Sequence, residues 1–331
     1  MRAVLMTGIG GPEVLKLADV PEPQITGERD VLVRLRAAGL NPVDYKLRSA
    51  GLISGTLPAV LGFDGAGVVE ATGRAVTRFR PGDEVYFCDG GFGPAPGTYQ
   101  EAKVVDERYL AAKPQRLSFV QAAAAPLVSI TAWEAIRGRA RVGQGQFVLI
   151  QGGAGGVGHM SVQIARLAGA RVATTVTPGP KTELAASLGA ELCIDYHRED
   201  VGERLRDWTG MDGADAVHDT VGGATFTDSF ALVRPYGDLV TSVESAWAEA
   251  AVTAMHDRNL RVSVTWMPAP AVFGWASHRE RQRAILEQAA RHFDAGELRV
   301  QVGSTFPLER AAEAHRALES GEVLGKAVLT M

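Results

Sequence analysis

The sequence predicts an α/β protein in which a β-rich N-terminal part is followed by a doubly wound parallel sheet. The length of 331 residues corresponds to about two domains at roughly 150 residues each. Short strand-like runs separated by Gly and Pro dominate the first part of the chain. A strand pattern followed by a helix pattern then repeats about every 25 to 30 residues, which is typical of βα units. We therefore expect one domain over residues 1–124, a second over 125–267, and a C-terminal segment, 268–331, that returns to the first.

Composition and charge exclude several classes of protein. The chain has 34 Lys and Arg against 38 Asp and Glu, a net charge of −4, whereas nucleic-acid and anionic-membrane proteins need a basic excess. Its two cysteines, Cys88 and Cys193, cannot form a disulfide framework or a Cys-rich zinc lobe. No apolar run approaches the roughly 18 residues that span a membrane. We expect a soluble, cytoplasmic protein that binds neither nucleic acid nor membrane.

The first domain is expected to be a barrel or sandwich of short strands. Residues 31–37, 65–71 and 84–88 predict strands, and the Gly- and Pro-rich residues 90–97 predict a loop. Ser118 is a suitable N-cap, and the Ala-rich residues 119–139 after it predict a helix.

The second domain is expected to consist of repeated βα units. Residues 147–150 form a continuous apolar run, as a parallel strand buried on both faces requires. Further strands are predicted over 171–176, 192–194, 214–219, 237–242 and 261–266, with helices over 157–168, 182–188, 200–208 and 225–233. The tail is expected to form helices over 279–295 and 308–320 and a last strand over 326–330.

A glycine-rich motif at residues 153–158 predicts a dinucleotide site. It fits G-x-G-x-x-G, follows a predicted strand and opens a predicted helix. Gly153 is expected to permit a tight turn, Gly155 to let the backbone approach a pyrophosphate, and Gly158 to allow close packing of the helix. The helix N-terminus adds free N–H groups and a partial positive charge for the phosphates. The cofactor contacts expected here are Gly153, Ala154, Gly155, Gly156, Val157 and Gly158.

The end of the second βα strand predicts NADPH rather than NADH. An NAD site places Asp or Glu there to hold the ribose 2′-hydroxyl, but residues 175–181 contain no acid. Thr177 and Lys181 suit a 2′-phosphate instead. Charged hydrogen bonds of roughly 1.5–3 kcal/mol would give about a ten- to hundredfold preference for NADPH. Lys181 as a solvated residue at the start of a helix remains the alternative.

Three segments together resemble the medium-chain dehydrogenase/reductase superfamily, and in particular its zinc-free quinone oxidoreductase branch, which includes zeta-crystallin. They are the glycine-rich turn, the segment from Pro126 to Trp133 with Thr131, and the segment from Gly39 to Asp44 with Asn41. The resemblance extends from the first residues to the last strand. It implies a GroES-like substrate domain, a Rossmann domain that binds NADPH, and a homodimer formed through residues 261–266.

The resemblance also implies individual contacts with the cofactor and the substrate. Asn41 matches a residue close to the nicotinamide and the substrate. The further residues implied to contact the cofactor are Thr131, Tyr196, Val221, Val243, Glu244, Trp266, Met267 and Lys326.

The same resemblance argues against zinc and leaves the proton donor open. Zinc-dependent relatives have Cys where this chain has Leu40-Asn41-Pro42, and Gly-His-Glu where it has Gly62-Phe63-Asp64. Thiolate and imidazole are the ligands that zinc needs, so we expect no metal. Many quinone reductases carry Tyr two residues after the position of Asp44, whereas this chain has Lys46 there and Tyr45 one residue earlier. A shift of one residue turns a helical side chain by about 100°.

Four residues of this segment are candidates for catalysis. Asn41 is expected to donate a hydrogen bond to a developing oxyanion, and the alternative is a turn residue before Pro42. Asp44 orients its neighbours or caps the short helix that follows. Lys46 is a proton donor if burial lowers its pKa, or else a solvated lysine. Tyr45 is the remaining candidate donor.

Other polar residues are weaker candidates. Tyr99 lines a pocket or packs within a strand. His218 and Asp219 are adjacent on a predicted strand, so their side chains should point to opposite faces rather than form a catalytic pair. The sequence has seven histidines, and none of them stands at a spacing that resembles a metal-binding motif.

The function expected is NADPH-dependent hydride transfer to a quinone or another conjugated C=C or C=O substrate. Without a metal, acceptors whose reduced form is delocalised are favoured, and the cofactor carries the hydride chemistry. Two alternatives are a reductase of a dedicated intermediate such as an enoyl thioester, and a non-catalytic NADPH-binding protein.

Overall fold

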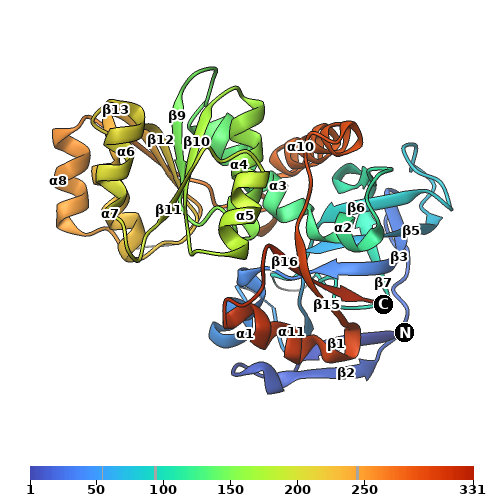
Figure 1. The fold of residues 1–331 in the computed structure, drawn as a ribbon. Helices are drawn as coiled ribbons and strands as arrows, with labels where there is room; N and C mark the ends of the chain where they lie inside the picture. The colour runs from blue at the N-terminus through green and yellow to red at the C-terminus, as the bar shows by residue number, and fades with distance from the viewer. Residues whose placement is uncertain (54, 93–94, 244–245) are drawn as a thin grey trace. The chain divides into compact units, whose positions relative to one another are not determined.

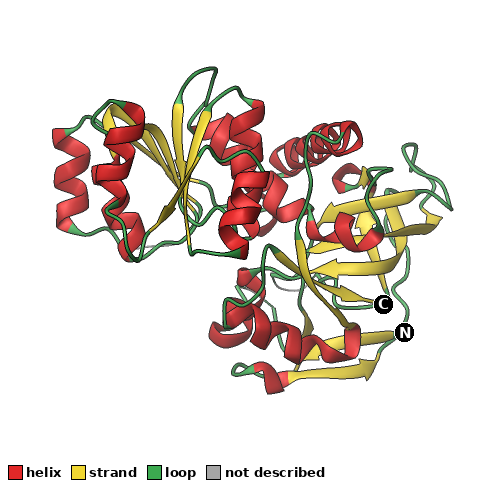
Figure 2. Cartoon of the chain, viewed as in Figure 1, coloured by secondary structure: helices red, strands yellow, loops and turns green. Residues whose placement is uncertain are grey.

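The computed structural model describes the chain apart from residues 54, 93–94 and 244–245, and it contains two compact units (Figure 1). The first unit consists of Met1–Leu127 together with Pro268–Met331, and the second is Val128–Met267. Both units contain helices and strands, so the α/β class is confirmed (Figure 2). In the described part of the chain, no helix has the length and apolar character that crossing a membrane requires.

The second unit is built on a six-stranded parallel sheet. Its strand order is β11-β10-β9-β12-β13-β14. Successive strands are added first on one side of β9 and then on the other, which confirms the predicted doubly wound sheet. The bounds are β9 (Phe147–Ile150), β10 (Arg171–Val176), β11 (Leu192–Asp195), β12 (Ala214–Asp219), β13 (Val233–Thr241) and β14 (Arg261–Val264). Strand β14 lies at one edge of the sheet, and dimerisation there stays a prediction.

Helices cover both faces of this sheet. Helices α4 (Gly156–Leu167) and α5 (Pro180–Ser187) lie on one face, and α6 (Val201–Thr209), α7 (Ala224–Leu232) and α8 (Glu249–Asp257) on the other (Figure 1). The apolar strand residues Leu149, Val217 and Leu239 are completely buried and form one core with Phe226 and Phe230 of α7. Because both faces are covered, these strands need continuous apolar sequence, which is why they were predictable.

The helix predicted over residues 119–139 is wrong as a single element. The structure divides it into α2 (Phe119–Ala124), α3 (Pro126–Trp133) and a π-helical turn, η3 (Glu134–Arg139). Pro126 has no amide hydrogen to continue α2, so a new helix begins at that residue. The predicted N-cap is confirmed, since Gln121 N donates to Ser118 Oγ at 3.2 Å and Ser118 N donates to Gln121 Oε1 at 3.0 Å.

The first unit contains two sheets. A small antiparallel sheet has the order β2-β1-β4, with β1 (Arg2–Met6), β2 (Leu15–Asp19) and β4 (Ala59–Val60). A seven-stranded sheet has the order β15-β16-β3-β5-β6-β8, with β7 also paired to β3. Its strands are β3 (Asp30–Gly39), β5 (Asp64–Thr72), β6 (Glu84–Cys88), β7 (Ala102–Asp106), β8 (Ala111–Ala112), β15 (Val302–Pro307) and β16 (Lys326–Thr330).

The pairing of β16 with β3 brings the end of the chain against its beginning. The two strands are antiparallel, with Val328 opposite Gly39, so Lys326 reaches the segment that follows β3. That segment begins α1 (Pro42–Ala50). Besides α2, the other helices described in this unit are η1 (Pro12–Val14), η2 (Glu107–Tyr109), α9 (Ala269–Val272), α10 (Ala276–Ala295), η4 (Leu308–Arg310) and α11 (Ala311–Glu319).

Candidate functional site

The glycine-rich turn of the second unit connects β9 to α4 and has no room for side chains at three positions. Gly152 has a φ of 72°, so it provides the sharp turn that was predicted for Gly153. A Cβ on Gly153 would overlap the Thr174 hydroxyl, and a Cβ on Gly158 would overlap the Gly152 carbonyl oxygen. Gly153 therefore permits packing against β10, and Gly158 permits packing of α4 against the turn.

Gly155 has a different environment from these three glycines. Among the described residues, an added Cβ would meet the Gly152 carbonyl oxygen, at 3.3 Å, which is a tight contact but not the overlap found at Gly153 and Gly158. Gly155 is also the N-cap of α4, where the first N–H groups of the helix have no partner within the helix. The turn thus offers bare backbone beside unpaired N–H groups, and this cradle fits the pyrophosphate of a dinucleotide.

Hydrogen bonds from neighbouring strands hold the turn in place. Gly152 N donates to Thr175 Oγ1 at 3.0 Å, and that hydroxyl donates to Gln151 Oε1 at 2.8 Å. Gln151 Nε2 in turn donates to Ser229 Oγ of α7 at 3.2 Å. The turn is therefore fixed before any ligand binds.

The residues predicted to contact a 2′-phosphate come directly after two neighbouring strands: Thr177 and Lys181 after β10, and Tyr196 after β11. Val176 is opposite Asp195 in the parallel ladder, so the two strands end at the same edge. Lys181 is half-buried near the start of α5, and Tyr196 is half-exposed. The acid of this region, Asp195, accepts from His197 N at 3.1 Å within its own turn. The end of β10 therefore offers Thr177 and a lysine but no carboxylate.

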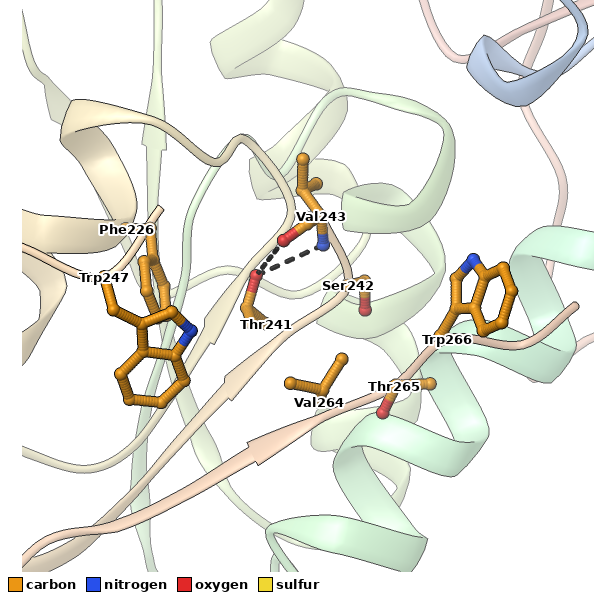
Figure 3. Close-up of a pocket in the computed structure, with 8 residues that line it drawn as sticks. All are labelled: Phe226, Thr241, Ser242, Val243, Trp247, Val264, Thr265 and Trp266. Carbon is orange, nitrogen blue, oxygen red and sulfur yellow. Dashed lines mark hydrogen bonds between the residues drawn. The ribbon is translucent and has the colours of Figure 1, made fainter. Parts of the chain in front are cut away.

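A pocket of about 370 Å³ lies at the carboxyl ends of β13 and β14 (Figure 3). Two of the predicted cofactor residues, Val243 and Trp266, line it. Thr265 Oγ1 has no hydrogen-bond partner among the described residues, although its side chain is buried. The complete lining is Phe226, Thr241, Ser242, Val243, Trp247, Val264, Thr265 and Trp266.

The remaining predicted cofactor residues are more dispersed. Thr131 is buried in α3, Met267 is buried at the end of the unit, and Val221 is half-exposed after β12. Glu244 lies outside the described residues. Lys326 belongs to the first unit and is completely enclosed there.

His218 and Asp219 point to opposite faces of the sheet, as the strand geometry predicts. Asp219 accepts from Val221 N at 3.0 Å, Gly222 N at 2.9 Å and Thr241 Oγ1 at 2.8 Å, so it shapes the ends of β12 and β13. His218 lies instead between Ser161 of α4 and Ser242. Burial lowers the pKa of His218 to about 3, so its imidazole is neutral.

A second polar cluster is buried in the first unit around Asn41. Lys326 Nζ donates to Leu40 O at 2.6 Å and to Asn41 Oδ1, and it lies 3.6 Å from Asp64 Oδ2. Asn41 Nδ2 donates to the same Asp64 oxygen at 2.9 Å, and Leu127 N donates to Asp64 Oδ1 at 2.9 Å. Burial raises the pKa of Asp64 and lowers that of Lys326, while the two opposite charges stabilise each other.

Asp44 lies in the same interior and caps α1. Its Oδ2 accepts from Asn41 N at 2.7 Å, so the predicted capping function has the required hydrogen bond. The Tyr99 phenol interacts with this carboxyl and is held by His315, whose Nε2 is 3.2 Å from Tyr99 Oη. Arg48 Nη1 contacts the other ring nitrogen at 3.3 Å. Because Arg48 can only donate, the neutral His315 accepts there and donates from Nε2 to Tyr99.

Burial raises the pKa of Asp44 to about 7, and this predicts a pH dependence of stability. An unfolded Asp has a pKa of about 3.9, so between about pH 4 and 7 the folded chain holds a proton that the unfolded chain has lost. The resulting stabilisation is complete below pH 4 and disappears as the pH rises to 7. Asp44→Asn removes this dependence. The difference in unfolding free energy between the wild type and the variant should therefore decrease, by at most about 4 kcal/mol, as the pH rises from about 4 to 7. Urea denaturation at half-unit pH intervals measures it, and parallel pH profiles for the two proteins would contradict it.

The other two catalytic candidates lie elsewhere on α1. Lys46 is exposed, as a solvated lysine would be, and Tyr45 is partly buried. The pKa of Tyr45 is raised by burial and by the negative charge of Glu319. The structure thus brings together Asn41, Asp44 and Lys326 and leaves Tyr45 and Lys46 apart from them.

Several polar residues of these clusters were not singled out as site candidates from the sequence. From the sequence, Asp64 stands out only as a position where zinc-dependent relatives differ. A carboxylate beside buried strand residues is itself a signal of a polar cluster, because a buried Asp needs a partner. His315, Ser161 and Ser242 gave no signal, because their partners are distant in the sequence or stand on another element.

Comparison with known proteins gives matches along the chain. Residues 27–115 match the family described as alcohol dehydrogenase GroES-like domain, and residues 188–329 match zinc-binding dehydrogenase. A quinone oxidoreductase of Pseudomonas aeruginosa is 33% identical over 329 residues, covering 99% of both chains. A 2-haloacrylate reductase of Burkholderia sp is 33% identical over 330 residues, covering 97% of this chain and 96% of the relative.

A solved structure shows the same fold with a cofactor bound. The quinone oxidoreductase of Escherichia coli complexed with NADPH is 28% identical, with a TM-score of 0.88 over 100% of both chains. In the described part of the present chain, no group of three or more His, Cys, Asp or Glu is arranged to hold a metal ion. At the position matching the Gly-His-Glu motif, Asp64 is engaged by Lys326, Asn41 and Leu127 N. It also interacts with the thiol of Cys88, the residue opposite it on β6, and burial and the charge of Asp64 raise the pKa of that thiol well above its usual value.

Proposed function

Because the chain belongs to the zinc-free quinone oxidoreductase branch of the medium-chain dehydrogenase/reductase superfamily, we propose that it is an NADPH-dependent reductase of quinones or of other conjugated C=C and C=O compounds. The observation that carries the proposal is the cradle at Gly152–Gly158 beside a β10 end that has Lys181 and no acid. A quinone and a 2-haloacrylate share a C=C bond conjugated with an acceptor group. This shared chemistry favours conjugate reduction over reduction of an isolated carbonyl.

The cofactor would be held along the carboxyl edge of the second unit's sheet. The turn and the start of α4 hold the pyrophosphate, and Lys181 and Tyr196 hold the 2′-phosphate end. The pocket residues Val243 and Trp266 lie on the opposite side of β9, where the nicotinamide half belongs. Bound NADPH supplies the hydride.

Asn41 is the residue proposed to interact with the reacting oxygen. Its Oδ1 is occupied by Lys326 and one Nδ2 hydrogen by Asp64, which leaves one amide hydrogen for a developing oxyanion. The buried ion pair fixes the direction of that hydrogen, so Asp64 and Lys326 act as positioning residues.

A substrate panel tests the proposed reaction. NADPH and NADH oxidation are followed with a simple quinone, an enone, an aldehyde and an enoyl thioester, each with and without a chelator. We expect turnover of the quinone or the enone with NADPH that the chelator does not change. Turnover limited to the aldehyde, or loss of activity with chelator, contradicts the proposal. Binding of NADPH without any turnover would favour the non-catalytic alternative.

Lys181→Ala tests the proposed 2′-phosphate contact. The substitution removes one charged hydrogen bond, so the Kd for NADPH should rise about tenfold while the Kd for NADH stays within about twofold. Calorimetric titration of both nucleotides measures the two constants. Lys16→Ala, which removes an exposed lysine on β2, is the matched control. An equal loss of affinity for both nucleotides would show that Lys181 does not contact the 2′-phosphate.

A further inference from the structure

Three side chains form a continuous buried path from α4 to the pocket wall of the second unit. His218 Nδ1 lies 3.0 Å from Ser161 Oγ, and His218 Nε2 lies 2.8 Å from Ser242 Oγ. Ser161 and His218 are almost completely buried, whereas Ser242 lines the pocket. None of these contacts is needed for the parallel ladder, which is made by backbone groups.

The direction of each hydrogen bond in this path is fixed. Ser161 Oγ lies 3.0 Å from the Val157 carbonyl oxygen, which can only accept, so the single hydroxyl hydrogen of Ser161 points there. Ser161 Oγ must then accept from His218, which places the ring hydrogen on Nδ1. The neutral ring has no hydrogen on Nε2, so Nε2 accepts from the Ser242 hydroxyl.

This arrangement makes Ser242 an acceptor toward the pocket. Its only hydroxyl hydrogen is directed to His218, so it can offer a ligand nothing but oxygen lone pairs. Thr241 also has no hydrogen to offer, because its hydroxyl is directed at Asp219 Oδ2 and the Val243 carbonyl oxygen, at 2.8 and 3.0 Å, and its oxygen already accepts from Val243 N at 3.2 Å. Thr265 differs, since its buried hydroxyl has no partner among the described residues and is available as a donor. The wall therefore suits a ligand group that carries an N–H and a carbonyl oxygen together.

A primary carboxamide on a flat ring is such a group. Val264 and Trp266 provide apolar walls for a ring beside Ser242 and Thr265, and Trp247 lies at the other end of the lining, next to Phe226 (Figure 3). In the strand order, this pocket lies across β9 from the 2′-phosphate candidates, on the side of the nicotinamide.

We propose that Ser242 Oγ accepts an N–H of the nicotinamide carboxamide, and that His218 is a positioning residue that keeps Ser242 an acceptor. This inference rests on the proposed NADPH binding. It assigns specificity for the carboxamide to a buried histidine that does not touch the ligand, and it requires the Nδ1–H form of the ring.

Equilibrium binding of two oxidised cofactors tests the inference. NADP⁺ is compared with its 3-acetylpyridine analogue, in which a methyl ketone replaces the carboxamide and no N–H remains. Quenching of tryptophan fluorescence reports both Kd values, because Trp247 and Trp266 line the pocket. The wild type should prefer NADP⁺ by about tenfold, the worth of about one hydrogen bond. Ser242→Ala should abolish this preference by weakening NADP⁺ alone, and Ser242→Thr should retain it.

Ser161→Ala tests the remote end of the path without changing the pocket. It removes the partner of His218 Nδ1–H, so the ring can move its hydrogen to Nε2 and release that of Ser242. The preference for NADP⁺ should then fall several-fold, and ¹⁵N NMR of the histidine rings should show His218 losing its single Nδ1–H form. Ser263→Ala, a serine of β14 outside the pocket lining, is the control and should keep the preference.

Three results would overturn the inference. They are an equal loss of affinity for both cofactors in Ser242→Ala, an unchanged preference in that variant, and an Nε2–H form of His218 in the wild type. Failure of the proposed function looks different, because the wild type would then bind neither cofactor.

Discussion

Lys326→Met is expected to lower the free energy of unfolding by about 3–5 kcal/mol. Removal of one member of a buried ion pair leaves the other charge unpaired, and Asp64 is completely buried. The substitution also removes the donors to Leu40 O and Asn41 Oδ1. Urea denaturation at pH 7 measures the loss.

The pH dependence and a double variant separate the ion pair from packing. Without Lys326, the pKa of Asp64 should rise further above its unfolded value, so the loss should be greatest at high pH and shrink as the pH falls and Asp64 takes up a proton. Lys326→Met combined with Asp64→Asn removes both charges and should recover most of the stability. If the double variant is as unstable as Lys326→Met alone, the lost stability comes from packing and not from the charge.

Gly158→Ala is expected to weaken NADPH binding by at least about a hundredfold. The new methyl group would overlap the Gly152 carbonyl oxygen, so α4 and the turn must move apart, and the N–H groups that bind the pyrophosphate move with them. Forcing a methyl group into a packed site also costs about 1–3 kcal/mol of stability. Calorimetric titration with NADPH and urea denaturation measure the two effects.

Two other glycines serve as controls for this result. Gly155→Ala places its methyl group 3.3 Å from the Gly152 carbonyl oxygen, a tight contact without the overlap at Gly158, so it should weaken binding with a smaller loss of stability than Gly158→Ala. At Gly138, no described residue outside its own helical turn has an atom within 4 Å of the new methyl group, so Gly138→Ala should leave the affinity unchanged. If Gly158→Ala binds NADPH as well as Gly138→Ala does, the turn does not hold the pyrophosphate.

The second unit was predictable from local sequence because its strands are buried on both faces. Strands β9, β10 and β12 have the predicted bounds. Strand β9 is a continuous apolar run, and β10 is apolar or β-branched after its first residue, whereas β12 mixes Ala and Val with Asp and His. In the first unit, β1, β2 and β15 were not predicted. They are short, and none has the regular alternation of buried and exposed residues that predicts a strand: β1 has no exposed residue, β15 has no buried one, and β2 has a single buried one, so their pattern is weak without the partner strand.

The candidate site divides in the same way. The phosphate turn is local, so six consecutive residues predict it, although the positive φ belongs to Gly152 rather than Gly153. The cluster of Asn41, Asp64 and Lys326 depends on the pairing of β16 with β3 across 285 residues. No spacing within one segment reveals such a contact. The path from Ser161 through His218 to Ser242 likewise joins three elements that only the sheet order brings together.

The most direct test of the proposed reaction is the position of the transferred hydrogen. An enone is reduced with NADPH deuterated at the transferable position of the nicotinamide, and the product is analysed by NMR. Conjugate reduction places the deuterium on the β-carbon and leaves the carbonyl intact. Deuterium on the carbonyl carbon, as an alcohol dehydrogenase would place it, contradicts the account.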